Sequence, residues 1–466
     1  MPLIDTDTIC AIATPPGRSG VGIVRISGPE ALSIAVRILG FTPKPRYAHY
    51  SDFLNTEHEV IDQGIALFFK QPHSFTGEDV IELQGHGGVY VQKALLDTVI
   101  SSGARLARPG EFSERSFLNN KIDLLQAEAI ADLIDSSSQQ AARSAIRTLQ
   151  GEFSQKIHTL LQQLVSARVN VEAAIDFSDE DIDIVSDTGV KESLLEILSS
   201  LVATLSQAQQ GALLKEGINV VIAGKPNAGK SSLLNALSGL DSAIVTDIPG
   251  TTRDLLTEKI TIDGMPVHII DTAGLRASED IVEKEGVRRA QVAIEQADQI
   301  LLVIDKSTAE QDVEKLLAPL VLLSNKSVHE IENLQNTTLV FNKIDLVETA
   351  QAEKCQVKLG KTELTTISLS AKHAKGMDLL KEHLKTITGF NSAEEGAFVA
   401  RERHLIALRN TKQLIESAMN HINDQSPLEL IAEDLRLAQA ELGTITGEFS
   451  SDDLLGEIFS NFCVGK

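Results

Sequence analysis

The sequence predicts a multidomain protein: an α+β amino-terminal domain, a discontinuous all-α domain, and an α/β domain inserted within the all-α one. The first observation behind this prediction is length, because 466 residues exceed one ordinary core and, at about 150 residues per domain, indicate two to four domains. The second is hydrophobic periodicity, which changes three times along the chain. These changes set the expected domain segments at residues 1–119, 120–215, 216–389 and 390–466.

The segment 1–119 mixes short apolar runs with turns rich in Pro, Gly and Ser, a pattern typical of α+β structure. In the segment 120–215, apolar residues recur at three- and four-residue steps, which predicts helices around Leu124–Ile134 and Ile157–Val165. The same spacing returns after Phe390. We therefore expect 120–215 and 390–466 to be two halves of one helical domain.

Short β-branched runs alternate with helical patterns between residues 216 and 389, which indicates a parallel sheet with crossover helices. The expected strands are Asn219–Ala223, Pro266–Ile270, Gln299–Ile304, Thr338–Phe341 and Thr366–Leu369.

Charge is the unusual property of the composition, since the formal net charge is −23. The two helical segments carry −7 each, whereas residues 1–119 carry only −3. A field of this sign disfavours indiscriminate binding of polyanions and leaves room for a local basic patch. Aromatic residues make up 4% of the chain, so a surface that stacks bases on many rings is not expected.

The three cysteines lack CxxC spacing, which argues against a disulfide framework or a structural zinc site and favours a reducing, cytoplasmic setting. The first residues do not have the pattern of a secretory signal, and no apolar run reaches the roughly 18 residues that span a bilayer. We expect no membrane association.

The segment Gly224–Ser231 fits GxxxxGK[ST] between a predicted strand and a predicted helix, and therefore predicts a phosphate-binding loop. Lys230 is expected to neutralise the β- and γ-phosphates, and Ser231 to ligate magnesium. The expected nucleotide contacts of this loop are Asn227, Ala228, Gly229, Lys230, Ser231 and Ser232.

Three further motifs follow in order, each at the carboxyl end of a predicted strand. The first is expected to meet magnesium and the γ-phosphate, the second to read guanine through Asp345, and the third to close on the base. They are Asp271, Thr272, Ala273 and Gly274; Asn342, Lys343 and Asp345; and Ser370, Ala371 and Lys372. All four motifs together predict a guanine-specific P-loop GTPase domain of the Ras-like type.

The polar stretch Thr246–Asp254 reads as a switch, in which Thr252 is expected to complete the magnesium shell. Leu275 stands where Ras-like enzymes carry a water-orienting glutamine, so another group must orient the water. Chemistry alone does not rank the candidate acids Glu279, Asp280, Glu283 and Glu285. The positive charge needed in the transition state is left to Arg253, Arg276 or a bound cation.

The chain also resembles the MnmE (TrmE) family of tRNA uridine-modification GTPases along its whole length. The motifs that carry the resemblance are Ala13–Arg18, Phe75–Asp79, Gln84–Gly88, Arg108–Phe112, the GTPase motifs, and Phe462–Lys466. The family's usual ending has Ile where this chain has Val464.

The resemblance implies a potassium ion near the β- and γ-phosphates in place of an arginine finger, with G domains that dimerise. The potassium ligands that it implies are Asn227, Thr246, Ile248 and Thr251. Glu283 aligns with the family's water-orienting glutamate, and the resemblance singles it out among the acids. We take Glu283, Lys230 and Arg276 as the expected catalytic residues.

For residues 1–119 the resemblance implies a domain that dimerises and binds a tetrahydrofolate derivative, 5-formyl or 5,10-methylene. Arg25, Glu82, Lys121 and Lys466 are the ligands carried over by motif. It further implies a homodimer, an FAD-containing MnmG (GidA) partner in a hetero-oligomer, and tRNA as substrate. The expected product carries an aminomethyl or carboxymethylaminomethyl group at C5 of the wobble uridine.

Two alternatives remain open at this stage. The same GTPase motifs occur in regulatory RNA-binding GTPases of ribosome assembly, which switch without modifying RNA. A folate enzyme regulated by GTP, with no RNA substrate, is the other alternative.

Overall fold

A computed structural model shows how these elements assemble. It describes residues 7–136, 138–176, 189–239, 257–271, 291–309, 313–324, 336–348, 350–359, 362–390, 396–448, 452–460, 462–463 and 465. The chain divides into two compact units, which are described separately. Unit 1 contains Met1–Asp135, Ala145–Thr204 and Arg403–Lys466, and unit 2 contains Ser136–Ser144 and Leu205–Glu402.

A six-stranded sheet begins unit 1, with strand order β3-β4-β5-β2-β1-β6. The strands are β1 (Ile9–Ile12), β2 (Ser19–Ser27), β3 (His49–Leu54), β4 (Val60–Phe69), β5 (Val80–Gly87) and β6 (Arg105–Leu106). Helices α1 (Ala31–Leu39) and α2 (Val89–Ser101) supply apolar side chains to its core. Because side chains alternate along a strand, Val24 and Ile26 enter this core while Arg25 lies on the opposite face.

A buried charge cluster joins this sheet to helix α3 (Glu111–Leu118). The Glu111 carboxylate accepts hydrogen bonds from Arg105 at 2.6 Å and from Arg115 at 3.2 Å, and Arg115 also pairs with Glu78 and Asp7. Burial alone would raise the pKa of Glu111, but hydrogen bonds from the Arg105 side chain and the Arg108 main chain, with the charges of Arg105 and Arg115, outweigh it and lower the pKa. Glu78 and Glu111 belong to two motifs behind the family resemblance, and in this structure they have structural partners.

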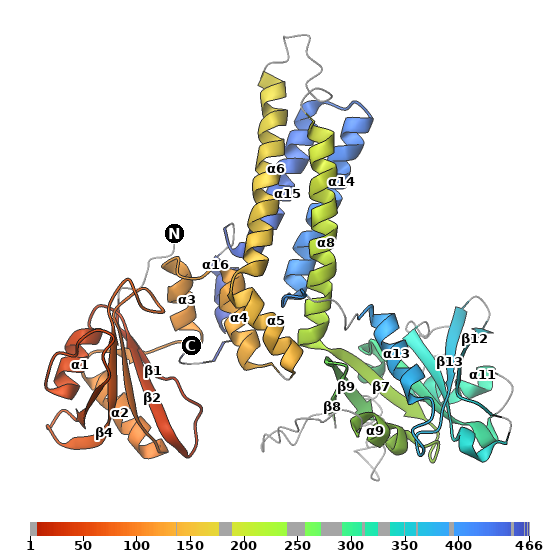
Figure 1. Cartoon of the computed structure of the whole chain (residues 1–466), viewed down its shortest axis with the longest axis horizontal. Coiled ribbons are helices and arrows are strands. Elements are labelled where there is room, and N and C mark those ends of the chain that lie inside the picture. Colours follow the sequence, from red (N-terminus) through yellow and green to blue (C-terminus); the bar gives the residue numbers. More distant parts are fainter. Residues whose placement is uncertain are drawn as a thin grey trace. The chain divides into compact units, whose positions relative to one another are not determined.

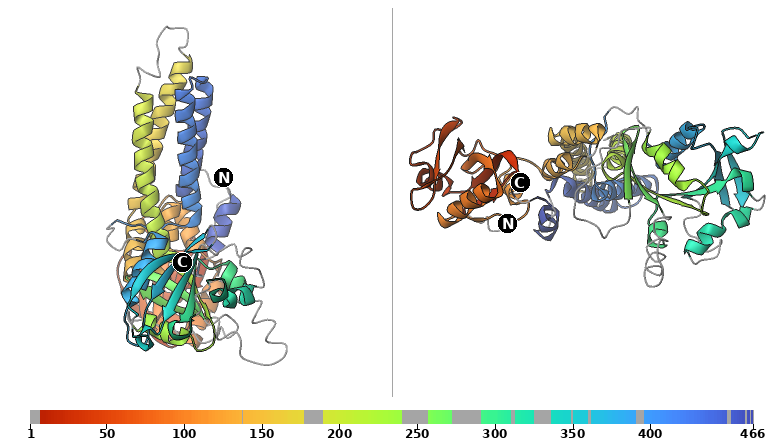
Figure 2. Two further views of the ribbon diagram at one scale, coloured as in Figure 1. Left: turned by 90° about the vertical axis from the view of Figure 1, so that its right-hand side faces the viewer. Right: turned by 90° about the horizontal axis from the view of Figure 1, so that it is seen from below.

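Long helices form the rest of unit 1, and Figures 1 and 2 show α6, α14 and α15 side by side with α8. Arg168 of α6 donates a 2.7 Å hydrogen bond to Gln439 of α15, and Lys191 of α8 donates one of 2.8 Å to Asn423 of α14. The helices are α4 (Leu124–Ile134), α5 (Gln139–Leu149), α6 (Glu152–Asp176), α8 (Val190–Glu216), α14 (Glu402–Asn423), α15 (Leu428–Thr446) and α16 (Asp452–Ser460). Residues 139–144 of α5, 205–216 of α8 and Glu402 at the start of α14 belong to unit 2.

The carboxyl-terminal segment packs against α3 and α4. Ile458, Phe459 and Phe462 form one apolar cluster with Leu124 and Ala127. Gly110, at φ 67°, allows this approach, because a Cβ there would meet the Phe459 carbonyl oxygen at 2.5 Å. The two ends of the chain are thus part of the same unit.

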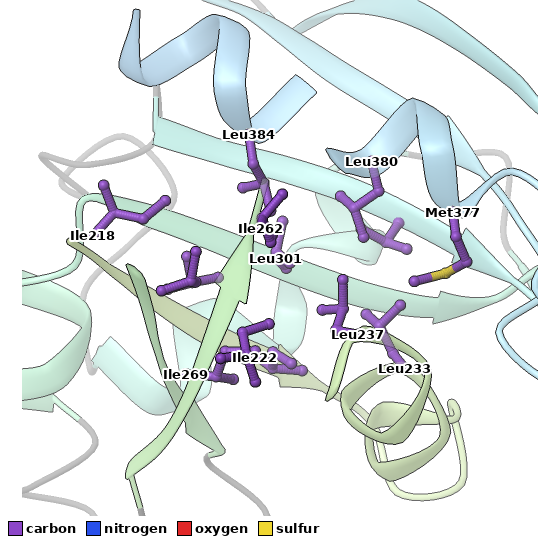
Figure 3. Close-up of a cluster of buried hydrophobic side chains, with 14 of the residues drawn as sticks. Ile218, Ile222, Leu233, Leu237, Ile262, Ile269, Leu301, Met377, Leu380 and Leu384 are labelled. Atoms are coloured by element: carbon purple, nitrogen blue, oxygen red, sulfur yellow. The ribbon is translucent and has the colours of Figure 1, made fainter. Parts of the chain in front are cut away.

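Unit 2 contains a seven-stranded sheet of order β12-β13-β11-β10-β7-β9-β8, parallel except for the two edge strands. Figure 3 shows helices α9 and α13 packing their leucines over it. The strands are β7 (Ile218–Gly224), β8 (Thr257–Ile262), β9 (Met265–Asp271), β10 (Gln299–Asp305), β11 (Thr337–Asn342), β12 (Glu353–Leu359) and β13 (Thr362–Ser368). The helices are α9 (Lys230–Ser238), α11 (Val313–Leu316), α12 (Ala318–Ser324) and α13 (Met377–Thr388).

The protein is therefore multidomain, with an α+β amino-terminal part, a discontinuous helical part and an inserted α/β P-loop part, as the sequence predicts. Four of the five expected strands lie within β7, β9, β10 and β11, and the fifth overlaps β13, which begins and ends earlier than expected. Edge strands β8 and β12 were not expected. No helix among the described residues is long and apolar enough to cross a membrane.

Candidate nucleotide-binding site

The loop between β7 and α9 has the backbone of a phosphate-binding loop. Gly229, at φ 96°, is the residue that precedes α9, and Gly224, at φ 149°, ends β7. Both conformations favour glycine, which has no Cβ to clash. The first N–H groups of α9 have no hydrogen-bond partner within the helix. They lie at the end of the loop, where the helix dipole attracts an anion.

Lys230 is buried at the start of α9, and its ammonium group turns back over the loop. Its Nζ atom donates to the main-chain oxygens of Gly224 and Lys225, both at 3.1 Å. A cation held at this position lies where the loop would receive phosphate oxygens. Ser231 and Ser232 follow in the first turn of α9 and are exposed.

Asn342 joins three of the predicted motifs. Its Nδ2 atom donates to the main-chain oxygens of Ala228 at 3.3 Å and of Gly229 at 3.4 Å. Its Oδ1 atom accepts from the main-chain N–H groups of Lys343 at 2.8 Å and of Ala371 at 3.0 Å. The buried amide therefore holds the phosphate-binding loop, the loop after β11 and the loop after β13 together.

Lys343 reinforces this connection, since its Nζ atom lies 2.7 Å from the main-chain oxygen of Asn227 and 2.7 Å from Oδ2 of Asp305. Burial opposes ionisation of Asp305, but hydrogen bonds from Lys343 and Ser307 outweigh it and lower the pKa of its carboxyl group. Asp305 ends β10 and was missed by the sequence analysis. An acidic residue directly after the predicted strand Gln299–Ile304 was the available signal.

Asp345, the residue expected to read guanine, is exposed as a whole, and its side chain is 23% exposed. Its Oδ1 atom accepts a 2.5 Å hydrogen bond from the hydroxyl of the buried Ser370. This hydrogen bond is the main cause that lowers the pKa of Asp345. The carboxylate is therefore ionised and fixed, with its remaining oxygen lone pairs able to accept from the two N–H donors on one edge of guanine.

A hollow of about 270 Å³ lies on the β10 side of the phosphate-binding loop. The loop segment Lys225–Ala228, the strand end Val303–Asp305 and residues Lys315 and Pro319 are among its lining. Neither Asp345 nor Ser370 lines it.

Several expected site residues lie outside the described part of the chain. They are Thr246, Ile248, Thr251, Thr252, Thr272, Ala273, Gly274, Arg276, Glu283 and Lys466. Asp271 is described in its main chain, which pairs with Ile222 of β7 and so places the end of β9 beside the phosphate-binding loop. The residues available to metal ions in the described part are Ser231 and Asn227, both exposed, and no cluster of three or more His, Cys, Asp or Glu side chains occurs there.

A second candidate site lies on the face of the sheet in unit 1 that is opposite to the α1–α2 core. Arg25 of β2 and Glu82 of β5 are cross-strand neighbours, joined by a 3.0 Å hydrogen bond from Nε to Oε1. Arg25 also donates a 3.1 Å hydrogen bond to the main-chain oxygen of Gly465 and stacks over Phe112. The carboxyl-terminal motif thus reaches the expected folate ligands.

Lys121 lies elsewhere in the same unit. Its side chain packs over Gly77, where a Cβ atom added to the glycine would lie 3.2 Å from Cε of Lys121. It lines a hollow of about 300 Å³ with His158 and Glu448. A larger cavity, about 610 Å³ and mainly apolar, brings Ala13–Gly17 together with Cys463. The structure thus unites Arg25 with Glu82, and the first motif with the last, whereas Lys121 lines a different hollow.

Two family models match the chain. One, described as the GTP-binding protein TrmE N-terminus, matches residues 8–121, and the other, described as the MnmE helical domain, matches residues 124–463.

Curated relatives match at full length. The chain is 55% identical over 460 residues to the tRNA modification GTPase MnmE of Hydrogenovibrio crunogenus, covering 99% of both chains. It is 54% identical over 466 residues to the protein of that name from Coxiella burnetii, covering 100% of both. Among solved structures, the G domain of the T. maritima FeoB iron transporter is 24% identical, with a TM-score of 0.25, over 36% of this chain and 98% of that one.

Proposed function

The chain belongs to the MnmE family of tRNA modification GTPases, and from this premise we propose that it couples GTP hydrolysis in unit 2 to modification of the wobble uridine of tRNA. The observation that carries the proposal is the position of Asn342. Its amide joins the phosphate-binding loop to the two loops that would read guanine, so phosphate and base recognition depend on one buried side chain.

Nucleotide binding follows from the chemistry of these groups. Lys230 and the amino end of α9 would hold the β- and γ-phosphates, and Asp345 with Ser370, Ala371 and Lys372 would hold guanine. Ser231, Thr252 and Asp271 are the proposed magnesium shell. Magnesium would neutralise charge that develops on the phosphate oxygens.

Hydrolysis needs a further positive charge and a group that orients water. We assign the charge to potassium, with Asn227, Thr246, Ile248 and Thr251 as its ligands. Glu283 is assigned to orient water, and Arg276 is a second source of charge. Asn227 supports the potassium assignment, because it is exposed at the mouth of the loop at φ 63°, a conformation that asparagine tolerates.

The sheet face of unit 1 that carries Arg25 and Glu82 is the proposed site of a tetrahydrofolate derivative, 5-formyl or 5,10-methylene. Glu82 can accept from the pterin N–H groups and Arg25 can donate to carboxylate or formyl oxygens, so the pair offers the donor and acceptor that such a ligand needs. Lys121 and Lys466 are the other proposed ligands. The bound folate would supply a one-carbon unit.

The modification chemistry is proposed to require a homodimer formed through residues 1–119. GTP-driven approach and separation of the two inserted G domains (216–389) would be relayed through the helical domain (120–215 and 390–466). An FAD-containing MnmG partner in a hetero-oligomer would share the redox chemistry. A tRNA substrate supports a cytoplasmic location. The proposed product is an aminomethyl or carboxymethylaminomethyl group at C5 of uridine.

Nucleoside mass spectrometry of tRNA from cells that lack the protein tests this function. We expect the modified wobble uridine to disappear and to return when the wild-type gene is supplied. A variant with Asp345→Asn should fail to restore it. An unchanged wobble uridine in the deleted cells would instead favour a GTPase of ribosome assembly.

Folate binding has its own test in isothermal calorimetry of the full chain with 5-formyl-tetrahydrofolate. Heat is expected from the wild type and not from Glu82→Ala, with Glu59→Ala, an exposed acid on the same sheet domain, as the matched control. Absence of heat from the wild type would contradict the folate assignment and leave the GTPase assignment standing.

A further inference from the structure

One end of the β3–β4 hairpin in unit 1 combines exposed aromatic rings with uncompensated positive charge. Its members are Lys44, Arg46, Tyr47, Tyr50, Lys70 and His73, and we call this set the basic–aromatic surface. All six are exposed, with Tyr47 at 59% and Tyr50 at 74%. The chain has three tyrosines in total, so this surface holds two of them.

Hydrogen bonds and ring contacts link five members of the set, Lys44, Arg46, Tyr47, Lys70 and His73, at this end of the hairpin, and Tyr50 follows His49 in β3. The Arg46 main-chain N–H donates to Phe68 at 2.8 Å, and its guanidinium group donates to the His73 carbonyl at 2.7 Å and lies 6.0 Å from the centre of the Phe69 ring. The His73 N–H donates to the Lys70 carbonyl at 3.0 Å. Arg46 and Lys70 therefore lie at the same end of β4.

His49 fixes the aromatic half of the surface. The Lys44 N–H donates to its Nε2 atom at 2.9 Å, so this nitrogen is an acceptor and carries no proton. The Tyr47 ring packs on the His49 ring with centroids 4.7 Å apart. Tyr47 is therefore held in place with more than half of its surface exposed, which reduces the entropy lost on stacking a ligand against it.

Charge separates the two ends of this hairpin. Glu57, Glu59 and Asp62 lie at or near the end that contains the β3–β4 turn, whereas Lys44, Arg46 and Lys70 lie at the other. Among the described residues, none of these three cations pairs with a carboxylate. Asp52 accepts a hydrogen bond from Gln63, and Asp79 accepts one from the main chain of Gln71.

We propose that the basic–aromatic surface binds unpaired nucleotides of the tRNA substrate, with Tyr47 and Tyr50 stacking on bases and Lys44, Arg46 and Lys70 contacting phosphates. This proposal rests on the tRNA-modification function proposed above. Proteins read RNA mainly at unpaired loops, where splayed bases stack on aromatic side chains. Local positive charge then holds the strand on a chain whose net charge is −23.

Complementary charge favours RNA over the other occupants of such a surface. A second copy of the chain would bring its own cations against these three, and like charges would repel. The chain has few aromatic residues, 4% of its sequence, so only a few bases could stack on it. Two exposed rings beside three cations are consistent with a site of that size.

The test measures binding of a fluorescein-labelled tRNA with a wobble uridine to the full-length protein by anisotropy. We expect Tyr47→Ala with Tyr50→Ala to weaken binding at least about thirtyfold, because base stacking is lost at two rings. Tyr47→Phe with Tyr50→Phe keeps the rings and should bind as the wild type does. Tyr90→Ala, an 84% exposed tyrosine on α2, is the matched control and should change nothing.

Salt dependence tests the phosphate contacts. A slope of log K against log salt of about −2 is expected for three phosphates on a single strand, and Lys44→Ala with Lys70→Ala should reduce its magnitude by about 1.4. Lys93→Ala, an exposed lysine on α2, is the control. Annealing an oligonucleotide across the anticodon loop should abolish the difference between the alanine pair and the wild type.

Equal tRNA affinity of the double alanine variant and the Tyr90→Ala control would overturn the proposal. So would a change of the double variant to monomers in sedimentation, which would identify the surface as an interface between copies. Wild-type protein that does not bind tRNA would also overturn it. Failure of the wild type to bind tRNA would not by itself contradict the proposed function, because nucleoside mass spectrometry measures modification in cells independently of this binding assay.

Discussion

The hydroxyl of Ser370 donates a 2.5 Å hydrogen bond to the carboxylate of Asp345 and so joins the loop after β13 to the loop after β11. Ser370 is buried, whereas Asp345 is exposed. The hydrogen bond therefore fixes an exposed acceptor from a buried donor. A fixed carboxylate can discriminate between bases because it does not have to be ordered when the nucleotide arrives.

Asp345→Asn is expected to change base specificity. The substitution replaces one acceptor oxygen by an N–H donor. The side chain then no longer matches the two N–H donors of guanine, and it matches xanthine, whose corresponding edge offers one donor and one acceptor. GTP affinity should fall roughly 10²–10⁴-fold, since one hydrogen bond to guanine becomes a donor facing a donor and the other loses its charged acceptor, while XTP affinity should rise. Nucleotide titrations measure both, with the exposed Asp378→Asn as control. Equal losses for GTP and XTP would contradict base reading by Asp345.

Asn342→Ala is expected to weaken nucleotide binding and stability together. The substitution leaves the buried N–H of Ala371 and the N–H of Lys343 without their acceptor, at about 1–3 kcal/mol each. Fluorescent GDP titration and thermal unfolding measure the two effects. Asn219→Ala, an exposed asparagine on β7, should change neither. Normal GDP affinity in Asn342→Ala would show that the three loops do not depend on this amide.

The parallel strands of unit 2 were predictable from sequence because each is buried on both faces and reads as an apolar run. The edge strands were not predicted. In β12 most of the described side chains are exposed, and polar residues at 354, 356 and 358 alternate with Cys355, Val357 and Leu359. This period-two pattern is typical of a strand, but the sequence prediction relied on continuous apolar runs and therefore missed it. Charged residues on an edge strand limit pairing with other chains.

Local pattern also predicted the residues of the nucleotide site but not the contacts between them. Asn342 and Ala228 are 114 positions apart, and Arg25 and Gly465 are 440 apart. Periodicity describes which residues share a face of one element, whereas these hydrogen bonds depend on how distant elements pack. The order of the motifs predicted that the loops lie at the carboxyl ends of the strands. The ion pair between Lys343 and Asp305 depends on packing and was not predicted.

Potassium is expected to accelerate GTP turnover by at least about tenfold over sodium, because a cation beside the β- and γ-phosphates replaces the charge of an arginine finger. Asn227→Ala should abolish the difference while leaving turnover in sodium unchanged. Steady-state phosphate release in buffers matched for ionic strength measures both. Equal wild-type rates in the two salts would remove the proposed role of potassium.

Glu128→Ala is expected to destabilise unit 1 by about 3–5 kcal/mol, because it leaves a partly buried guanidinium and a buried imidazole without their carboxylate. The Glu128 Oε2 atom lies 2.8 Å from Nη2 of Arg403 and 3.0 Å from Nε2 of His404, and Arg403 also donates to the Thr444 carbonyl. Chemical unfolding measures the loss. Glu433→Ala, which removes an exposed pair with Arg436, is the control and should have no resolvable effect.

The same cluster predicts a loss of stability in acid. Burial would raise the pKa of Glu128, but the charges and hydrogen bonds of His404 and Arg403 outweigh it and hold the pKa far below its ordinary value of 4.5. A depressed carboxyl pKa gives stability that is complete above about pH 4.5 and is lost as the pH falls below it. Glu128→Ala should therefore lose less stability than the wild type between pH 4.5 and pH 3.

His383 predicts a second, separate pH dependence, in unit 2. Its Nε2 atom lies 2.7 Å from the Thr338 hydroxyl, which also accepts from Gln299. The Thr338 O–H is thus free to donate to Nε2 when this nitrogen carries no proton. Burial, with a smaller contribution from the charge of Lys354, lowers the pKa of His383 to about 4 from its ordinary value of 6.5. Protons bind the unfolded chain first, so the stabilisation is complete above pH 6.5 and falls as the pH drops to 4.

We expect His383→Gln to flatten this dependence, because glutamine can accept the Thr338 hydrogen bond and does not titrate. The measurement is the melting temperature of the full chain between pH 6.5 and 4, followed in the transition that GDP shifts upward, since ligand binding stabilises only the unit that binds it. His73→Gln, at an exposed site in unit 1, should keep the slope of the wild type. Parallel curves for His383→Gln and the wild type would show that His383 is not the group whose protonation destabilises the nucleotide-binding unit.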